Sequence, residues 1–298
     1  MDKVIKLTPH IKSYLWGGTY FKPYVQGNFD IISELWVLSV RGENSSLLPN
    51  GQTLNEVITS QDIGPAGDRF SYFPLLIKLI DAKENLSVQV HPSDEYALIN
   101  EHSFGKSEMW HIISADDGAG LYVGFNKDYQ KEEIEKHLKD GSILETLNFF
   151  KVKPGETHII DPGTIHAIGA GVRLIEIQQN SDLTYRLYDY LRKDKDGNYR
   201  PLHIDKALQV INYHKYNLCP PKGSLLANNQ YFRVERIVVN NELTLSSNKG
   251  SFISFTFLQG KGMVDDIPYR EFDTFFLPYG KKCMIKGDGV LIASSVNL

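Results

Sequence analysis

The sequence has 298 residues, of which 42% are hydrophobic and 23% are charged, and 32 Lys and Arg stand against 36 Asp and Glu. These proportions are typical of a globular protein, and the length allows about two domains. The net charge of −4 argues against a nucleic-acid-binding protein, which usually carries a basic surface. A basic pocket for a small anion is compatible with this balance, because charge can be concentrated locally.

Two features of the chain indicate a cytoplasmic protein. No apolar run approaches the roughly 18 residues of a transmembrane helix, and residues 1–6 lack the apolar core of a signal peptide. Cys219 and Cys283 are the only cysteines, so there is no disulfide framework and no zinc-binding Cys pair. We therefore expect a cytoplasmic protein with neither membrane nor nucleic-acid partners.

Short apolar runs bounded by Gly, Pro, Asn and Asp recur along the chain, which is typical of an all-β sandwich or barrel. The clearest helix covers 128–139, where acidic residues come early, basic residues come late and Gly141 follows. Shorter helices are expected over 54–60 and 204–211. The predicted strands are Leu35–Val40, Leu75–Ile80, Met109–Ile113, Leu121–Phe125, His158–Ile160 and Leu174–Ile177.

A break at Cys219–Gly223 predicts two domains, 1–216 and 217–298. Both contain a proline-initiated turn, and the residue that follows it is His166 in the first and Cys283 in the second. We expect the smaller second domain to be a degenerate repeat of the first without a metal site, although two unrelated hairpins could produce the same pattern. Its predicted strands are Phe232–Val239, Phe252–Leu258, Thr274–Leu277, Met284–Ile285 and Val290–Ala293.

Three segments of the first domain carry residues suited to a metal site. Gln89 and His91 alternate onto one face of a predicted strand. Glu108 lies on an apolar strand face, where a carboxylate needs a cationic partner, either a metal ion or Lys106. His166 begins another apolar strand. Each residue alone fits a solvated or core position, but together they can make a four-ligand site for Zn²⁺ or a non-haem metal.

A fourth segment is charged and follows the His166 strand. Glu176, Asp182 and Arg186 lie within eleven residues of one another. They fit a surface loop with an ion pair of little consequence for stability. They equally fit acid–base carboxylates and a cation that orients a substrate.

Several motifs in a fixed order give the chain a specific family resemblance. It resembles the type I mannose-6-phosphate isomerases in their short bacterial form, and the resemblance extends over nearly the whole chain. The motifs are Trp16-Gly17-Gly18, Glu34-Leu35-Trp36, Gln89-Val90-His91-Pro92, Gly105-Lys106-Ser107-Glu108, Gly163–Ile168, Ser181–Tyr190 and Leu202–Leu208.

The resemblance implies a mainly β fold of two cupin-like jelly-roll domains with a few short helices. Longer relatives carry an added helical domain, for which this chain is too short. One zinc ion per chain is implied, bound by Gln89, His91, Glu108 and His166. The implied catalytic residues are Arg186, Lys106, Glu176 and Asp182, and those implied at the phosphate end of the substrate are Ser87 and Lys78.

The implied reaction interconverts mannose 6-phosphate and fructose 6-phosphate through an enediol(ate). The metal would stabilise negative charge and Arg186 would supply a permanent cation, while the proton could be moved by Lys106, Glu176 or Asp182. Two other classes stay open: a metal-dependent cupin oxygenase and a non-catalytic cupin that binds sugar phosphates. The fourth ligand Gln89 and the cationic pocket argue against the oxygenase. A different aldose–ketose pair within the family is a third alternative.

Overall fold

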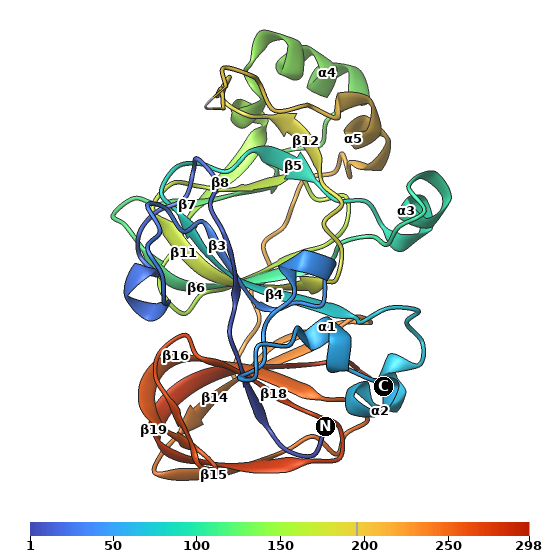
Figure 1. Ribbon diagram of the computed structural model, residues 1–298. Coiled ribbons are helices and arrows are strands. Elements are labelled where there is room, and N and C mark those ends of the chain that lie inside the picture. Colours follow the sequence, from blue (N-terminus) through green and yellow to red (C-terminus); the bar gives the residue numbers. More distant parts are fainter. Residues whose placement is uncertain (195, 298) are drawn as a thin grey trace.

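The computed structural model describes residues 1–194 and 196–297 as three β-sheets with short helices at their edges. In Figure 1 the six-stranded sheet lies between the eight-stranded sheet below and the five-stranded sheet above. The five- and six-stranded sheets face each other, and the eight-stranded sheet curls on itself. The expected fold class, mainly β with two cupin-like bodies and a few short helices, is confirmed.

The strand order in each sheet differs from the order along the chain. The six-stranded sheet runs β2 (His10–Lys12), β3 (Glu34–Leu38), β4 (Leu75–Ala82), β11 (Val172–Gln179), β6 (Glu108–Ala115) and β9 (Thr157–Ile160). The five-stranded sheet runs β12 (Tyr185–Tyr188), β5 (Val88–Val90), β10 (His166–Ile168), β7 (Gly120–Phe125) and β8 (Leu147–Lys151). The eight-stranded sheet runs β1 (Ile5–Leu7), β18 (Thr274–Leu277), β16 (Ile253–Val264), β19 (Lys282–Ser295), β14 (Arg233–Val239) and β13 (Leu225–Asn228), with β15 (Glu242–Ser246) beside β19 and β17 (Ile267–Tyr269) beside β16.

The predicted helices are present, with one split in two. The longest begins with a capping box and ends at Gly141, whose φ of +79° is the left-handed conformation that terminates helices. The stretch predicted over 54–60 forms two single turns, because Thr59 is extended and caps the second. None of the described helices is long and apolar enough to cross a membrane. They are α1 (Leu54–Val57), α2 (Ser60–Ile63), α3 (Asp94–Asn100), which was not predicted, α4 (Lys131–Asp140) and α5 (Ile204–Val210).

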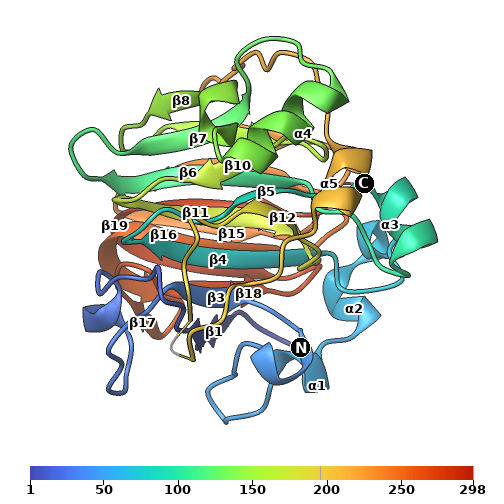
Figure 2. The same ribbon diagram turned by 90° about the horizontal axis from the view of Figure 1, so that it is seen from above.

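Buried apolar side chains form successive layers between these elements. One layer, with Trp110 and Leu121, fills the space between the six- and five-stranded sheets. A second, with Val90 and Ile134, lies between the five-stranded sheet and helices α4 and α5, which cover its outer face in Figure 2. Since the first layer is closed on both sides by sheets, polar groups that enter it lie in a low-dielectric environment.

The two ends of the chain share one sheet. Strand β1 pairs antiparallel with β18, with Ile5 opposite Phe276, and its blue ribbon lies among the red strands of the lower body in Figure 1. A buried layer that contains Leu7 also contains Leu226. The boundary between two domains at residue 216 therefore stays a proposal. In it, the second domain also includes strand β1 from the beginning of the chain as an edge strand.

Candidate metal centre and adjoining cavity

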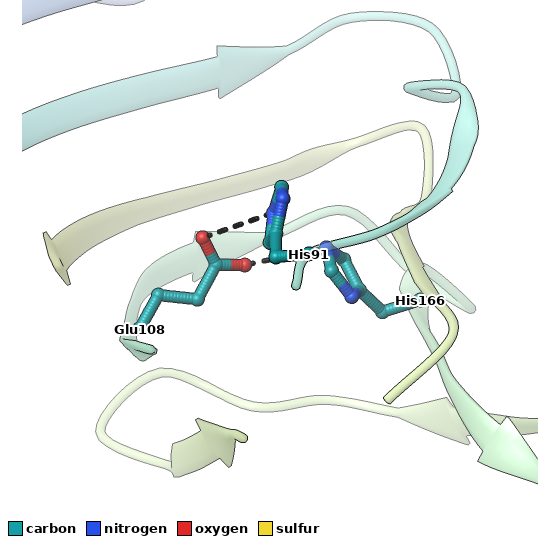
Figure 3. A group of neighbouring side chains, drawn as sticks. All are labelled: His91, Glu108 and His166. Carbon is teal, nitrogen blue, oxygen red and sulfur yellow. Dashed lines mark ion pairs between the residues drawn. The ribbon is translucent and has the colours of Figure 1, made fainter. Parts of the chain in front are cut away.

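Residues from both facing sheets meet at one end of the first body. His91 follows β5, His166 begins β10, and these strands are neighbours in the five-stranded sheet. Glu108 begins β6 of the six-stranded sheet opposite. Their ligand atoms all lie within 4.8 Å of one another, and all three side chains are buried. Figure 3 shows both imidazoles turned toward the carboxylate.

Backbone hydrogen bonds hold the three segments together. The N–H of Gly163 donates to the carbonyl of His91 at 2.9 Å, and the N–H of Lys106 donates to the carbonyl of Pro92 at 3.1 Å. Gly163 has a φ of +86°, and a Cβ there would lie 2.9 Å from the carbonyl oxygen of Val210, so this turn requires glycine. The turn that places His166 and the loop that places Glu108 are thus both anchored beside His91.

The hydrogen bonds of the imidazoles determine which nitrogen faces the carboxylate. Nδ1 of His91 lies 2.9 Å from the carbonyl of Leu183, and Nδ1 of His166 lies 2.8 Å from that of Thr164. A carbonyl only accepts, so each Nδ1 carries the proton and each Nε2 presents a lone pair. Burial and the nearby ammonium of Lys106 lower the pKa of His91 to about 3, and burial also lowers that of His166.

These lone pairs point at the oxygens of Glu108, an arrangement that is favourable around a cation. Nε2 of His91 lies 3.5 Å from Oε2, and Nε2 of His166 lies 3.3 Å from Oε1 (Figure 3). Ligand atoms about 2.1 Å from one tetrahedral metal ion would be about 3.4 Å apart. Neither buried oxygen of Glu108 accepts a hydrogen bond of normal geometry from the described residues. Two neutral imidazoles and a buried carboxylate with their ligand atoms this close together fit a divalent metal.

Gln89 lies at the edge of this group. Its Nε2 is 3.4 Å from Nε2 of His166, which has no proton to share in the tautomer described above. Amide oxygen and nitrogen positions are assigned from such contacts, and the reversed amide would present Oε1 to the group. Gln89 therefore fits a fourth, neutral ligand.

Next to His91, Glu108 and His166 lie further charged side chains, which belong to strands β4 and β11 and to the loop before β6. Lys106 Nζ lies 2.6 Å from Oε2 of Glu108 and 3.9 Å from Oε1 of Glu176. Glu176 also accepts from Lys78 at 2.9 Å and from the indole of Trp110 at 2.8 Å. Burial alone would lower the pKa of Lys78, but the carboxylate of Glu176 reverses this and raises it. The alternation of acids and bases offsets the cost of burying them.

A cavity of about 380 Å³ opens beside these charges. Its wall includes Gln89, Lys106 and Glu176, which lie near His91, Glu108 and His166. It also includes Ser87 and Arg186. Nε of Arg186 donates to the hydroxyl of Ser87 at 3.2 Å. The cavity has the volume for a small polar ligand, and its wall carries both signs of charge.

Comparison with known proteins identifies the family. Residues 4–107 match the sequence profile described as phosphomannose isomerase type I, catalytic domain. The chain is 36% identical to mannose-6-phosphate isomerase ManA of Bacillus subtilis, over 91% of this chain and 92% of that protein. It is 31% identical to mannose-6-phosphate isomerase of Streptococcus mutans, over 100% and 99% of the two chains.

The chain belongs to the type I mannose-6-phosphate isomerase family. The crystal structure of the mannose 6-phosphate isomerase from Bacillus subtilis is similar over 99% of this chain and 100% of that one, with a TM-score of 0.90 and 31% identity. A putative mannosephosphate isomerase from Archaeoglobus fulgidus, at 23% identity, shares the fold over 100% of this chain and 99% of that one, with a TM-score of 0.84. The expected family and enzyme class are confirmed.

The residues expected at a mannose-6-phosphate isomerase site lie together, and one of them, Asp182, lies at the rim. His91, Glu108 and His166 form the buried group, and all the remaining predicted residues line the cavity beside it. The carboxylate of Asp182 is 64% exposed and forms an ion pair with Arg41 at 2.7 Å. Asp182 lines this cavity and also a larger neighbouring hollow of about 920 Å³, so it lies at the rim.

Sequence reasoning gave no role to several residues of the cavity wall. Trp16, Glu34 and Trp36 belong to the quoted motifs, but nothing local indicated what they face. Tyr14 stacks on Trp16 with ring centroids 5.5 Å apart, which offers a flat aromatic surface beside the cavity. Arg200 lies outside the helices and strands, where no local pattern marks it. Only contacts between segments far apart in the sequence bring these residues to the site.

Proposed function

We propose that this chain interconverts mannose 6-phosphate and fructose 6-phosphate with one zinc ion bound by Gln89, His91, Glu108 and His166. The observation that carries the proposal is the convergence of two neutral imidazole nitrogens on one buried carboxylate, that of Glu108. A cavity lined by Lys and Arg adjoins it, as an anionic substrate requires. Membership of the isomerase family supports the same substrate pair.

A bound zinc ion would act as a Lewis acid that polarises the carbonyl of the sugar and stabilises negative charge on its oxygens. The chain's own residues do the rest. Arg186 lies opposite Gln89 in the pairing of β12 with β5, so its permanent charge lies beside the metal ligands. It is positioned to stabilise the enediolate that forms when the C2 proton is removed.

Proton transfer between C2 and C1 needs a base with access to the same end of the cavity. Glu176 is buried and lies 3.9 Å from Lys106, and both line the cavity. We propose that Glu176 takes up the proton from C2 and that a proton returns to C1 from Glu176 or Lys106, with Lys78 and Trp110 holding the carboxylate of Glu176 in place. Asp182 stays a second candidate base, and its exposure and ion pair with Arg41 make it the less favoured one.

We also propose a reducing, cytoplasmic setting for the enzyme. Cys219 is exposed, Cys283 is buried, and both are free thiols. Burial raises the pKa of Cys283 to about 12, which keeps it protonated and unreactive. Free thiols in the absence of disulfides are usual where the environment is reducing.

The test is a coupled isomerase assay with mannose 6-phosphate on chelator-stripped protein, with and without added Zn²⁺. We expect activity that returns with the metal and fails to return in Glu108→Gln. Oxygen uptake after iron loading would support the oxygenase alternative instead. Folded, zinc-loaded protein that binds mannose 6-phosphate without converting it would overturn the proposal in favour of a binding protein.

A further inference from the structure

The guanidinium of Arg186 is a cation without a carboxylate partner. It donates to the Ser87 hydroxyl at 3.2 Å and to the carbonyl of Pro201 at 3.0 Å, and both acceptors are neutral. Within residues 1–194 and 196–297 no carboxylate lies within ion-pair distance of it. Burial and the neighbouring guanidinium of Arg200 lower the pKa of Arg186. This part of the cavity therefore has an excess of positive charge.

Arg200 is the second guanidinium, and it is held rigidly. Nε donates to Oδ2 of Asp189 at 2.7 Å and Nη2 to Oδ1 at 2.5 Å, which is a bidentate pair. Asp189 is buried and accepts a further hydrogen bond from Nη2 of Arg192 at 2.5 Å. One carboxylate thus serves two cations. Nη1 of Arg200 donates to no acceptor among the described residues, so it is available to a ligand.

The position of Arg200 suits the far end of a substrate. It lines the 380 Å³ cavity and also an adjacent hollow of about 480 Å³ that shares Tyr14 and Trp16 with it. Its side chain is 33% exposed, whereas Lys106 at the metal end is 5% exposed. A sugar whose reacting carbons lie at the metal group would therefore extend its other end toward Arg200.

We propose that Arg200 binds the phosphate of the substrate and makes the site selective for a phosphorylated sugar, an inference that rests on the proposed isomerase function. A phosphate monoester carries about −1.5 to −2 charges and favours guanidinium donors in a fixed orientation. Asp189 is the positioning residue that supplies this orientation.

This assignment changes the roles of Ser87 and Lys78, which the family resemblance implied at the phosphate end of the substrate. Lys78 is buried and held at 2.9 Å by Glu176, so its charge is already matched. The Ser87 hydroxyl accepts from Arg186 and can offer its own proton to the same phosphate. Arg200 is the cation that keeps a donor, Nη1, without an acceptor among the described residues and lines both the cavity and the adjacent hollow.

The experiment compares Arg200→Gln and Arg200→Lys with the matched control Arg192→Gln. Arg192 contacts the same carboxylate but lines only the adjacent hollow. We expect Arg200→Gln to raise KM for mannose 6-phosphate about 10- to 100-fold with kcat within about 3-fold, because uniform binding is lost. Arg200→Lys should recover part of the affinity, and Arg192→Gln should leave KM within about 2-fold.

Calorimetric titration with inorganic phosphate measures the affinity for phosphate directly, without relying on catalytic turnover. Weakened phosphate binding in Arg200→Gln alone supports the assignment. An unchanged KM in Arg200→Gln overturns it, and so does an equal loss in Arg192→Gln, which would point to loop integrity. If wild-type protein binds phosphate through Arg200 yet does not convert mannose 6-phosphate, the proposed function fails while the phosphate site stands.

Discussion

Gln89 and Arg186 lie directly opposite each other where strands β5 and β12 pair, and Gln89 is also opposite His166 in β10. Opposite residues of an antiparallel pair project from the same face of a sheet. A slip of one residue in β12 would turn Arg186 away from the cavity. The register of these short strands therefore places a permanent cation beside Gln89 and His166, two of the proposed metal ligands.

Arg186→Ala tests that relationship. We expect kcat to fall about 10²- to 10³-fold, as when a group that stabilises developing oxyanion charge is removed. Metal content and the unfolding temperature should stay close to those of the wild type. The control is Arg233→Ala, because Arg233 pairs with Glu235 on the second body. A kcat within a few-fold of the wild type would show that Arg186 is not catalytic.

His166→Ala tests the ligand set. The variant lacks one of the two imidazole nitrogens proposed as ligands, so we expect the zinc content, measured by atomic emission, to fall from about one per chain to well below half. His214→Ala is the control, because that imidazole is 84% exposed and remote from the group. Normal zinc content in folded His166→Ala would contradict the assignment.

Removal of the carboxylate from the Lys106–Glu108 pair should destabilise the metal-free protein. Glu108→Gln leaves a buried ammonium without its partner at 2.6 Å, which costs about 3–5 kcal/mol in such pairs. The double variant Lys106→Met with Glu108→Gln should recover most of this loss. The readout is urea unfolding in the presence of chelator. A double variant less stable than Glu108→Gln alone would refute the expected coupling.

Asp189 should make stability depend on pH. Burial alone would raise the pKa of its carboxyl, but the hydrogen bonds from Arg200 and Arg192 more than offset this and hold the pKa below its usual value of about 3.9. The stabilisation is present above that value and is lost as pH falls through the lowered pKa. Asp189→Asn should cost about 1–3 kcal/mol at pH 7.

This cost should shrink progressively below about pH 4, because the carboxyl of the unfolded wild-type chain takes up a proton there, whereas that of the folded protein does so only at lower pH. Urea unfolding at several pH values measures it. Asp266→Asn is the control, since that side chain is exposed and forms no ion pair among the described residues. A cost that stays constant from pH 7 to pH 3 would count against the ion-pair explanation.

Ile177→Ala separates stability from activity. Ile177 is fully buried in the layer between the six- and eight-stranded sheets, while its neighbour Glu176 lies on the opposite face. We expect a loss of about 2–5 kcal/mol in unfolding free energy, with kcat nearly unchanged at temperatures where the protein stays folded. Val238→Ala, at a 49% exposed position, should cost little. Equal losses in both variants would argue against this packing.

The local sequence determined the elements and the chemical types of the ligands. Alternating apolar residues predict strands because side chains project alternately to the two faces, and helix α4 carries its own capping residues and terminal glycine. Gln89, His91, Glu108 and His166 could be selected because metal coordination demands particular atoms, whatever the fold around them. The family resemblance then supplied their combination and the reaction.

Only the tertiary structure decided which distant residues meet. The pairing of β1 with β18, the rim position of Asp182 and the convergence of Arg200 with Arg186 all depend on contacts between segments far apart in sequence. No local pattern encodes such contacts, because a polar loop residue looks alike whether it faces solvent or a cavity. The charge state and orientation of these groups follow from burial and partners, which exist only once the sheets have packed.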